Sequence, residues 1–111
     1  SRDSVTTQWV LSNLPGDWKV ILVGDAQMAP YELMGDYSYS PNRDPNAPKT
    51  GLDWLHRFRG KYPNVIWLNP SQRPTWGQYW TQTYDTIARI FPMFPLTVDG
   101  LEDGMKKLLS R

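Results

Sequence analysis

The sequence predicts an α/β fold of three layers, in which a mostly parallel sheet of about three strands lies between flanking helices. Short apolar runs alternate along the chain with longer segments of helical periodicity, and strands separated by helices pair in parallel through right-handed crossovers. The runs at 18–23 and 64–68 are nearly continuous, as in strands covered on both faces. With 111 residues, the whole of 1–111 is expected to form a single unit.

In the first half of the chain, prolines, glycines and the loss of apolar periodicity predict where each element ends. A short helix is expected from Asp3 to Asn13, where a proline and a glycine follow. The apolar run at 18–23 is the candidate for the central strand. We expect one helical turn at 30–34, and then a long loop at 35–49, because that stretch holds three prolines and no apolar periodicity.

The second half continues the alternation. Thr50 is expected to cap a helix that closes near Gly60 and Pro63, and the strand at 64–68 follows. The segment 71–80 is polar and aromatic, which predicts a loop.

Two helices and a strand complete the chain. The first of these helices is expected to begin at a cap formed by Thr81 or Thr83. The strand at 93–98 is expected at a sheet edge, because Pro95 cannot donate to a ladder. The last helix should begin near Asp99, with an inward stripe of Leu101, Met105, Leu108 and Leu109.

Composition excludes several classes of function. The formal net charge is +1, which gives no basic excess for nucleic acid or an anionic membrane, so neither partner is expected. The chain has no cysteine, and therefore no disulfide framework, thiol nucleophile or cysteine zinc site. No apolar run approaches the ~20 residues that cross a bilayer. A cytoplasmic location is the resulting expectation.

Three segments carry a family resemblance. Residues 20–26 read Val-Ile-Leu-Val-Gly-Asp-Ala, residues 65–70 read Val-Ile-Trp-Leu-Asn-Pro, and residues 94–101 read Phe-Pro-Leu-Thr-Val-Asp-Gly-Leu. Together they resemble the later strands of the CoxE-like group of von Willebrand factor A (VWA) domains, and 67–70 is the most specific piece. The resemblance implies a doubly wound, Rossmann-like sheet of which this chain is the C-terminal half.

The resemblance also implies a function. VWA domains are non-catalytic protein–protein interaction modules that hold a divalent cation at a metal-ion-dependent adhesion site. By its place after a strand, Asp25 resembles the aspartate ligand of that site, and its hard oxygen suits Mg²⁺ or Mn²⁺. The other ligands would lie in the rest of the longer protein, so tight metal binding by this chain alone is not expected. CoxE-like proteins are associated with MoxR-type AAA+ ATPases, which makes such an ATPase the implied partner.

Two other features could suggest a metal site or a catalytic site. The string Asp36-x-Ser38-x-Ser40 matches the adhesion-site turn literally, but it follows the Asp25 strand instead of preceding it and lacks a buried strand before it. His56 is the only histidine, and its helical neighbours supply no triad. A small hydrolase-like α/β enzyme using Asp25 and a residue of the 35–49 loop remains as an alternative.

The aromatic residues suggest contact surfaces. Trp76 and Trp80 fall in or beside a loop, and tryptophan is enriched in interface hot spots, so both are candidate partner-binding residues. With Tyr79 they could instead form an aromatic platform that stacks on sugars or bases. A sheet of three strands also leaves an edge exposed, which predicts self-association or pairing through the strand at 18–23.

Overall fold

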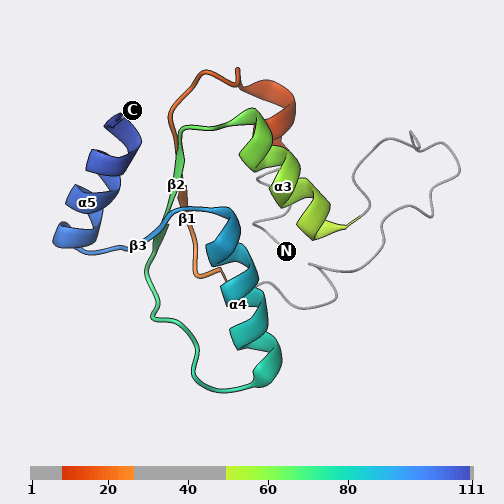
Figure 1. Ribbon diagram of the computed structural model, residues 1–111, viewed down its shortest axis with the longest axis vertical. Helices are drawn as coiled ribbons and strands as arrows, with labels where there is room; N and C mark the ends of the chain where they lie inside the picture. Colours follow the sequence, from red (N-terminus) through yellow and green to blue (C-terminus); the bar gives the residue numbers. More distant parts are fainter. Residues whose placement is uncertain (1–8, 27–49, 111) are drawn as a thin grey trace, which may run out of the picture.

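The computed structural model describes residues 9–26 and 50–110. A short helical segment at 9–13 comes first. The elements that follow, in chain order, are β1 (Val20–Val23), α3 (Gly51–Lys61), β2 (Val65–Asn69), α4 (Gln78–Ile90), β3 (Met93–Pro95) and α5 (Val98–Leu109) (Figure 1). The predicted alternation of helices and strands is therefore confirmed over the described residues. The expected turn at 30–34, the loop at 35–49 and the Asp36–Ser40 string lie outside them.

The three strands form one parallel sheet in the order β1-β2-β3. The prediction that the strand at 18–23 is central is wrong: β2 lies in the middle, and β1 is an edge strand among the described elements. All five β2 side chains are buried, whereas every second side chain of β1 is exposed. Apolar composition alone does not distinguish the two, because both strands are rich in aliphatic residues. Among the described strands, β3, which contains Pro95, lies at the other edge, as predicted.

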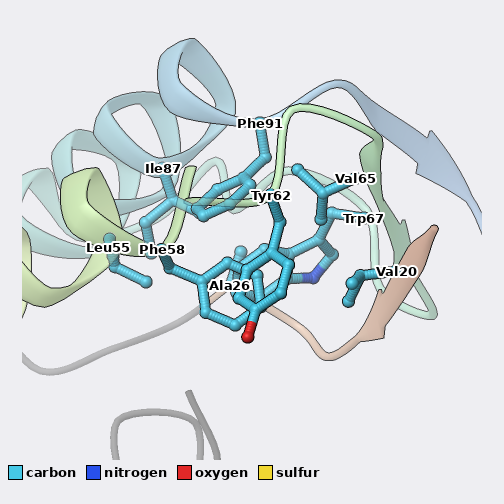
Figure 2. Close-up of a cluster of buried hydrophobic side chains, with 9 residues drawn as sticks. All are labelled: Val20, Ala26, Leu55, Phe58, Tyr62, Val65, Trp67, Ile87 and Phe91. Carbon is cyan, nitrogen blue, oxygen red and sulfur yellow. The ribbon is translucent and has the colours of Figure 1, made fainter. Parts of the chain in front are cut away.

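Helices cover both faces of the sheet, which gives the predicted three layers (Figure 1). On one face, α3 and α4 pack against the strands and enclose the larger core. Its buried members are Val20, Ala26, Leu55, Phe58, Tyr62, Val65, Trp67, Ile87 and Phe91 (Figure 2). Aromatic rings meet at its centre: the Phe58 and Tyr62 centroids lie 4.6 Å apart, and those of Trp67 and Phe91 lie 5.4 Å apart. Tilted pairs of this kind add to the stabilisation that comes from burial.

The segment at 9–13 is joined to α3 by hydrogen bonds. The Tyr62 hydroxyl lies 2.7 Å from the carbonyl oxygens of both Val10 and Leu14, which share its single O–H donor. The Lys61 ammonium donates to the Leu11 carbonyl at 2.7 Å. Lys61 and Tyr62, at the end of α3, therefore hold the first helical segment through its carbonyl groups, and the Val10 carbonyl also accepts the Leu14 N–H at 2.9 Å.

On the other face, α5 packs on β2 and β3 through a smaller cluster in which Ile66, Leu68 and Leu108 are buried. The predicted inward stripe is partly wrong, because Leu101 and Leu109 are exposed and the buried positions are Gly100, Gly104 and Leu108. The two glycines bring α5 close to the sheet. A Cβ at Gly104 would lie 2.9 Å from Ile66 Cδ1, and one at Gly100 would overlap the Pro95 carbonyl.

Helix α3 begins as predicted and α4 does not. Thr50 and Asp53 form a reciprocal capping box at the start of α3. Helix α4 starts at Gln78 after Gly77, three residues before the expected Thr81 cap, so Trp80 belongs to its first turn. The Thr81 and Thr83 hydroxyls instead donate back to helix carbonyls, those of Gln78 and Trp80. Threonine satisfies backbone groups in either role, which is why spacing alone misplaces the start.

Candidate functional site

The carboxyl edge of the sheet is the candidate site. Because the strands are parallel, all three end at this edge, where open α/β sheets bind their ligands. Asp25 follows β1, Asn69 ends β2, and Leu96 and Thr97 follow β3. Asp25 is therefore at the kind of position that was predicted for it.

The turn that carries Asp25 is held by side chains of β2. The Trp67 indole Nε1 donates to the Gly24 carbonyl at 2.7 Å, and the Asn69 amide Nδ2 lies 3.3 Å from the Asp25 carbonyl, to which it donates. The Gly24 N–H donates to the Leu68 carbonyl at 3.2 Å. Both side chains are buried, and a hydrogen bond in a buried site is strong because water competes poorly for it.

Ala26 closes the same turn in an unusual conformation. Its φ is 55°, in the left-handed region that L residues with a Cβ seldom adopt, and its side chain is fully buried in the larger core. Such a conformation persists only where the surroundings enforce it. Asp25 thus stands exposed between two anchored residues, on a backbone of fixed course.

The described residues do not by themselves fit a magnesium or manganese site. No group of three or more histidine, cysteine, aspartate or glutamate side chains that could hold a metal lies within 9–26 and 50–110. Mg²⁺ requires six oxygen ligands in near-octahedral geometry. At this edge, Asp25 offers one carboxylate, while the Asn69 side-chain oxygen already accepts the Ser71 N–H at 2.8 Å.

A cleft of about 410 Å³ opens beyond the ends of β2 and β3. Its walls include Asn69, Ser71, Arg73, Tyr84 and the segment 93–97. The Arg73 guanidinium makes a bidentate pair with Asp85, with both N–O distances at 2.8 Å. These hydrogen bonds lower the pKa of Asp85 and raise that of Arg73. Asp85 is therefore engaged in an ion pair at the surface of α4.

Trp76 and Trp80 form a pair at the start of α4. Their ring centroids lie 6.1 Å apart at an interplanar angle of 56°, and Trp76 is 63% exposed. Gly77, at φ 72°, turns the chain between them. The sequence identified both residues, and the structure brings them together. The Tyr79 side chain, named with them as a stacking residue, lies outside what is described.

A second surface lies along β1. Ile21 and Val23 are 42% and 58% exposed, although their register partners on β2, Ile66 and Leu68, are 0% and 3% exposed. These four residues occupy one face of the sheet, which α5 covers over β2 and β3. Beside them, β1 presents an edge with no strand paired to it among the described residues.

Sequence reasoning missed the anchoring roles of Trp67 and Asn69. The available signal was a polar residue at the end of an otherwise apolar strand, since a buried amide requires partners. His56 is exposed on α3. None of the described helices is long and apolar enough to cross a membrane.

Comparisons with protein-family models, with curated proteins and with solved structures give no match to this chain.

Proposed function

We propose that the chain is a non-catalytic protein–protein interaction module of the VWA type, in which β1 is the edge where the sheet is completed. The observation that carries this proposal is the exposure of Ile21 and Val23 beside the buried Ile66 and Leu68. Parallel sheets are normally covered on both faces. An apolar strand with an exposed face, and with an edge that no described strand pairs with, is therefore a surface for another polypeptide.

In this proposal Asp25 supplies one ligand of a divalent-metal site, for Mg²⁺ or Mn²⁺, that residues beyond this chain complete. Its support is the anchored turn, which fixes the backbone on both sides of Asp25. The chain then corresponds to the C-terminal part of a CoxE-like domain, and its partner is an ATPase of the MoxR type. A cytoplasmic location belongs to the same proposal.

Calorimetric titration of Mg²⁺ and Mn²⁺ tests the metal part. We expect binding by a longer protein that includes this chain, loss of that binding in Asp25→Ala, and none by the 111-residue chain alone. Asp17→Ala is the matched control, because Asp17 is also exposed but precedes β1 at the opposite end of the strand. Metal binding by the short chain that survives Asp25→Ala would contradict the assignment of Asp25.

The aromatic pair favours a second candidate, a binding platform for sugars or bases. A base stacked on an aromatic ring is stabilised by about 1–3 kcal/mol, and the ring of Trp76 is 63% exposed. Trp76→Ala should abolish the binding of a neutral oligosaccharide or a short single-stranded oligonucleotide while Trp9→Ala, which removes another exposed tryptophan, leaves it intact. Absence of any binding by the unmodified chain removes this candidate. The hydrolase alternative depends on the 35–49 loop, which lies outside the described residues.

A further inference from the structure

The open edge of β1 has a defined hydrogen-bonding direction. The N–H groups of Val20 and Gly24 donate to the carbonyls of Asn64, which directly precedes β2, and Leu68 of β2, at 2.9 and 3.2 Å. Backbone groups alternate sides along a strand, so those of Ile21 and Val23 point away from β2. No strand within 9–26 and 50–110 pairs with this edge, which can therefore accept one more strand with Ile21 and Val23 as its hydrogen-bonding residues.

We infer that a second copy of this chain occupies this edge, with the two β1 strands antiparallel about a two-fold axis perpendicular to the sheet. The inference rests on the interaction edge proposed above and concerns the 111-residue chain on its own, because in a longer protein another strand would compete for the same edge. A two-fold contact uses the same patch twice, so the patch must be complementary to itself.

One register satisfies that requirement. When Leu22 faces Leu22 of the second copy, Ile21 faces Val23 and Lys19 faces Asp25. The outward backbone groups of Ile21 and Val23 then exchange both N–H···O bonds with their opposite residues, as in a hydrogen-bonded antiparallel pair. The facing charges are of opposite sign, and such cross-strand pairs are favourable.

The neighbouring registers do not pair the two opposite charges. A shift that sets Ile21 against Ile21 places Lys19 opposite Val23, and a shift that sets Val23 against Val23 places Asp25 opposite Ile21. Both put a charge against an aliphatic side chain. Self-pairing is therefore specified by the four residues that alternate along this edge.

The two edges of the sheet also differ in protection. The β3 strand is three residues long and ends in Pro95, and short edge strands with proline resist pairing. The β1 strand has four aliphatic residues and no proline. After pairing, the exposed Ile21 and Val23 side chains of both copies would lie side by side on one face, between the two α5 helices.

Sedimentation equilibrium over a range of concentrations, with the 111-residue chain, tests this inference. We expect a reversible dimer that is lost in the double variant Ile21→Lys/Val23→Lys and kept in Ile21→Lys/Val23→Glu. In the inferred register the second variant sets each new lysine against a new glutamate, so its dimer should weaken as salt is added. Ile21 and Val23 are 42% and 58% exposed, so circular dichroism should show an unchanged fold.

A cysteine placed at the two-fold axis gives an independent readout, because the chain has no cysteine of its own. Oxidised Leu22→Cys should form a covalent dimer, since opposed Cβ atoms in a non-hydrogen-bonded pair lie about 4.5–5.5 Å apart, close to disulfide range. Ile21→Cys, whose equivalent in the second copy is not directly opposite, is the control and should cross-link far less.

Three results would overturn the inference: a monomer at every concentration, a dimer that survives the double lysine variant, or equal cross-linking at positions 21 and 22. Hydrogen exchange of a monomeric chain separates this failure from failure of the proposed function. Fast exchange at Ile21 and Val23 would leave an open edge for a different strand, such as one from a longer protein. Slow exchange there would contradict both proposals.

Discussion

β1 and β2 are adjacent parallel strands of similar composition that end up in opposite environments. Ile66 and Leu68 of β2 are buried under α5, while Ile21 and Val23, their register partners on β1, remain exposed. On the opposite face the two strands are alike, because Val20, Val65 and Trp67 share the larger core. The difference therefore arises from what covers each strand: α5 covers β2 and β3 and leaves this face of β1 exposed, which is the basis of the proposal that β1 meets another polypeptide.

The largest expected effect comes from the matched pair Ile66→Ala and Ile21→Ala. The first removes a fully buried side chain and should lower the free energy of unfolding by roughly 2–5 kcal/mol. The second should cost about 1 kcal/mol or less in dilute solution, because Ile21 is partly exposed. Urea unfolding monitored by tryptophan fluorescence measures both. Equal losses would mean that β1 is covered as fully as β2.

Trp67→Phe removes the side-chain hydrogen bond between β2 and the turn that follows β1. It keeps an aromatic ring in the core but removes the donor to the Gly24 carbonyl, at a cost of roughly 1–3 kcal/mol. Hydrogen exchange should rise at Gly24, whose N–H bonds to Leu68. Unchanged exchange there would show that the indole hydrogen bond does not hold the turn. Trp18→Phe, at an exposed tryptophan, is the control.

Gly100→Ala tests how closely α5 packs against β3. The new methyl would meet the Pro95 backbone, which cannot move aside as a flexible side chain can. The cost of this overpacking should exceed the gain in helix propensity, so the free energy of unfolding should fall by roughly 1–2 kcal/mol. Gly60→Ala has open space around its Cβ on α3 and should instead stabilise the chain by up to about 1 kcal/mol. Thermal unfolding should show a lower melting temperature for Gly100→Ala and a higher one for Gly60→Ala. A higher melting temperature for Gly100→Ala would contradict the tight packing of α5.

The smallest effect belongs to the surface pair of Arg73 and Asp85. Because the folded-state pKa of Asp85 is lowered, chiefly by the hydrogen bond from Arg73, the pair stabilises the fold above the ordinary pKa of aspartate. That contribution is lost as the pH falls through the lowered folded-state value. The stability difference between the unmodified chain and Asp85→Asn should therefore be constant near neutral pH and shrink in acid. A difference that grew in acid would have the wrong sign, and Arg73→Gln should reproduce the profile of Asp85→Asn.

Sequence reasoning predicted the layers, the parallel sheet, the Thr50 cap and the edge position of the strand containing Pro95. These features depend on local signals: apolar periodicity, capping residues and a missing N–H donor. It could not rank β1 against β2, because strand order is set by contacts between distant segments. It also placed Leu101 inward, since only the packed structure shows that Gly100 and Gly104 allow the closer approach.

In the candidate site, too, the residues identified from the sequence are those with a local signal. Asp25 was found from its place after a strand, and Trp76 and Trp80 from their aromatic character beside a loop. Asn69 and Trp67 were not recognised as anchors, because their partners are backbone carbonyls more than forty positions away in the chain. A donor can be read from a sequence, but the carbonyl that accepts from it at such a distance cannot.

Amide hydrogen exchange along β1, measured residue by residue in dilute solution, tests the open edge most directly. The N–H groups of Val20 and Gly24 donate to β2 and should exchange slowly, whereas those of Ile21 and Val23 should exchange fast. Protection of Ile21 and Val23 should then appear as the protein concentration rises. Slow exchange at all four positions in dilute solution would mean that this edge is already paired and would contradict the account.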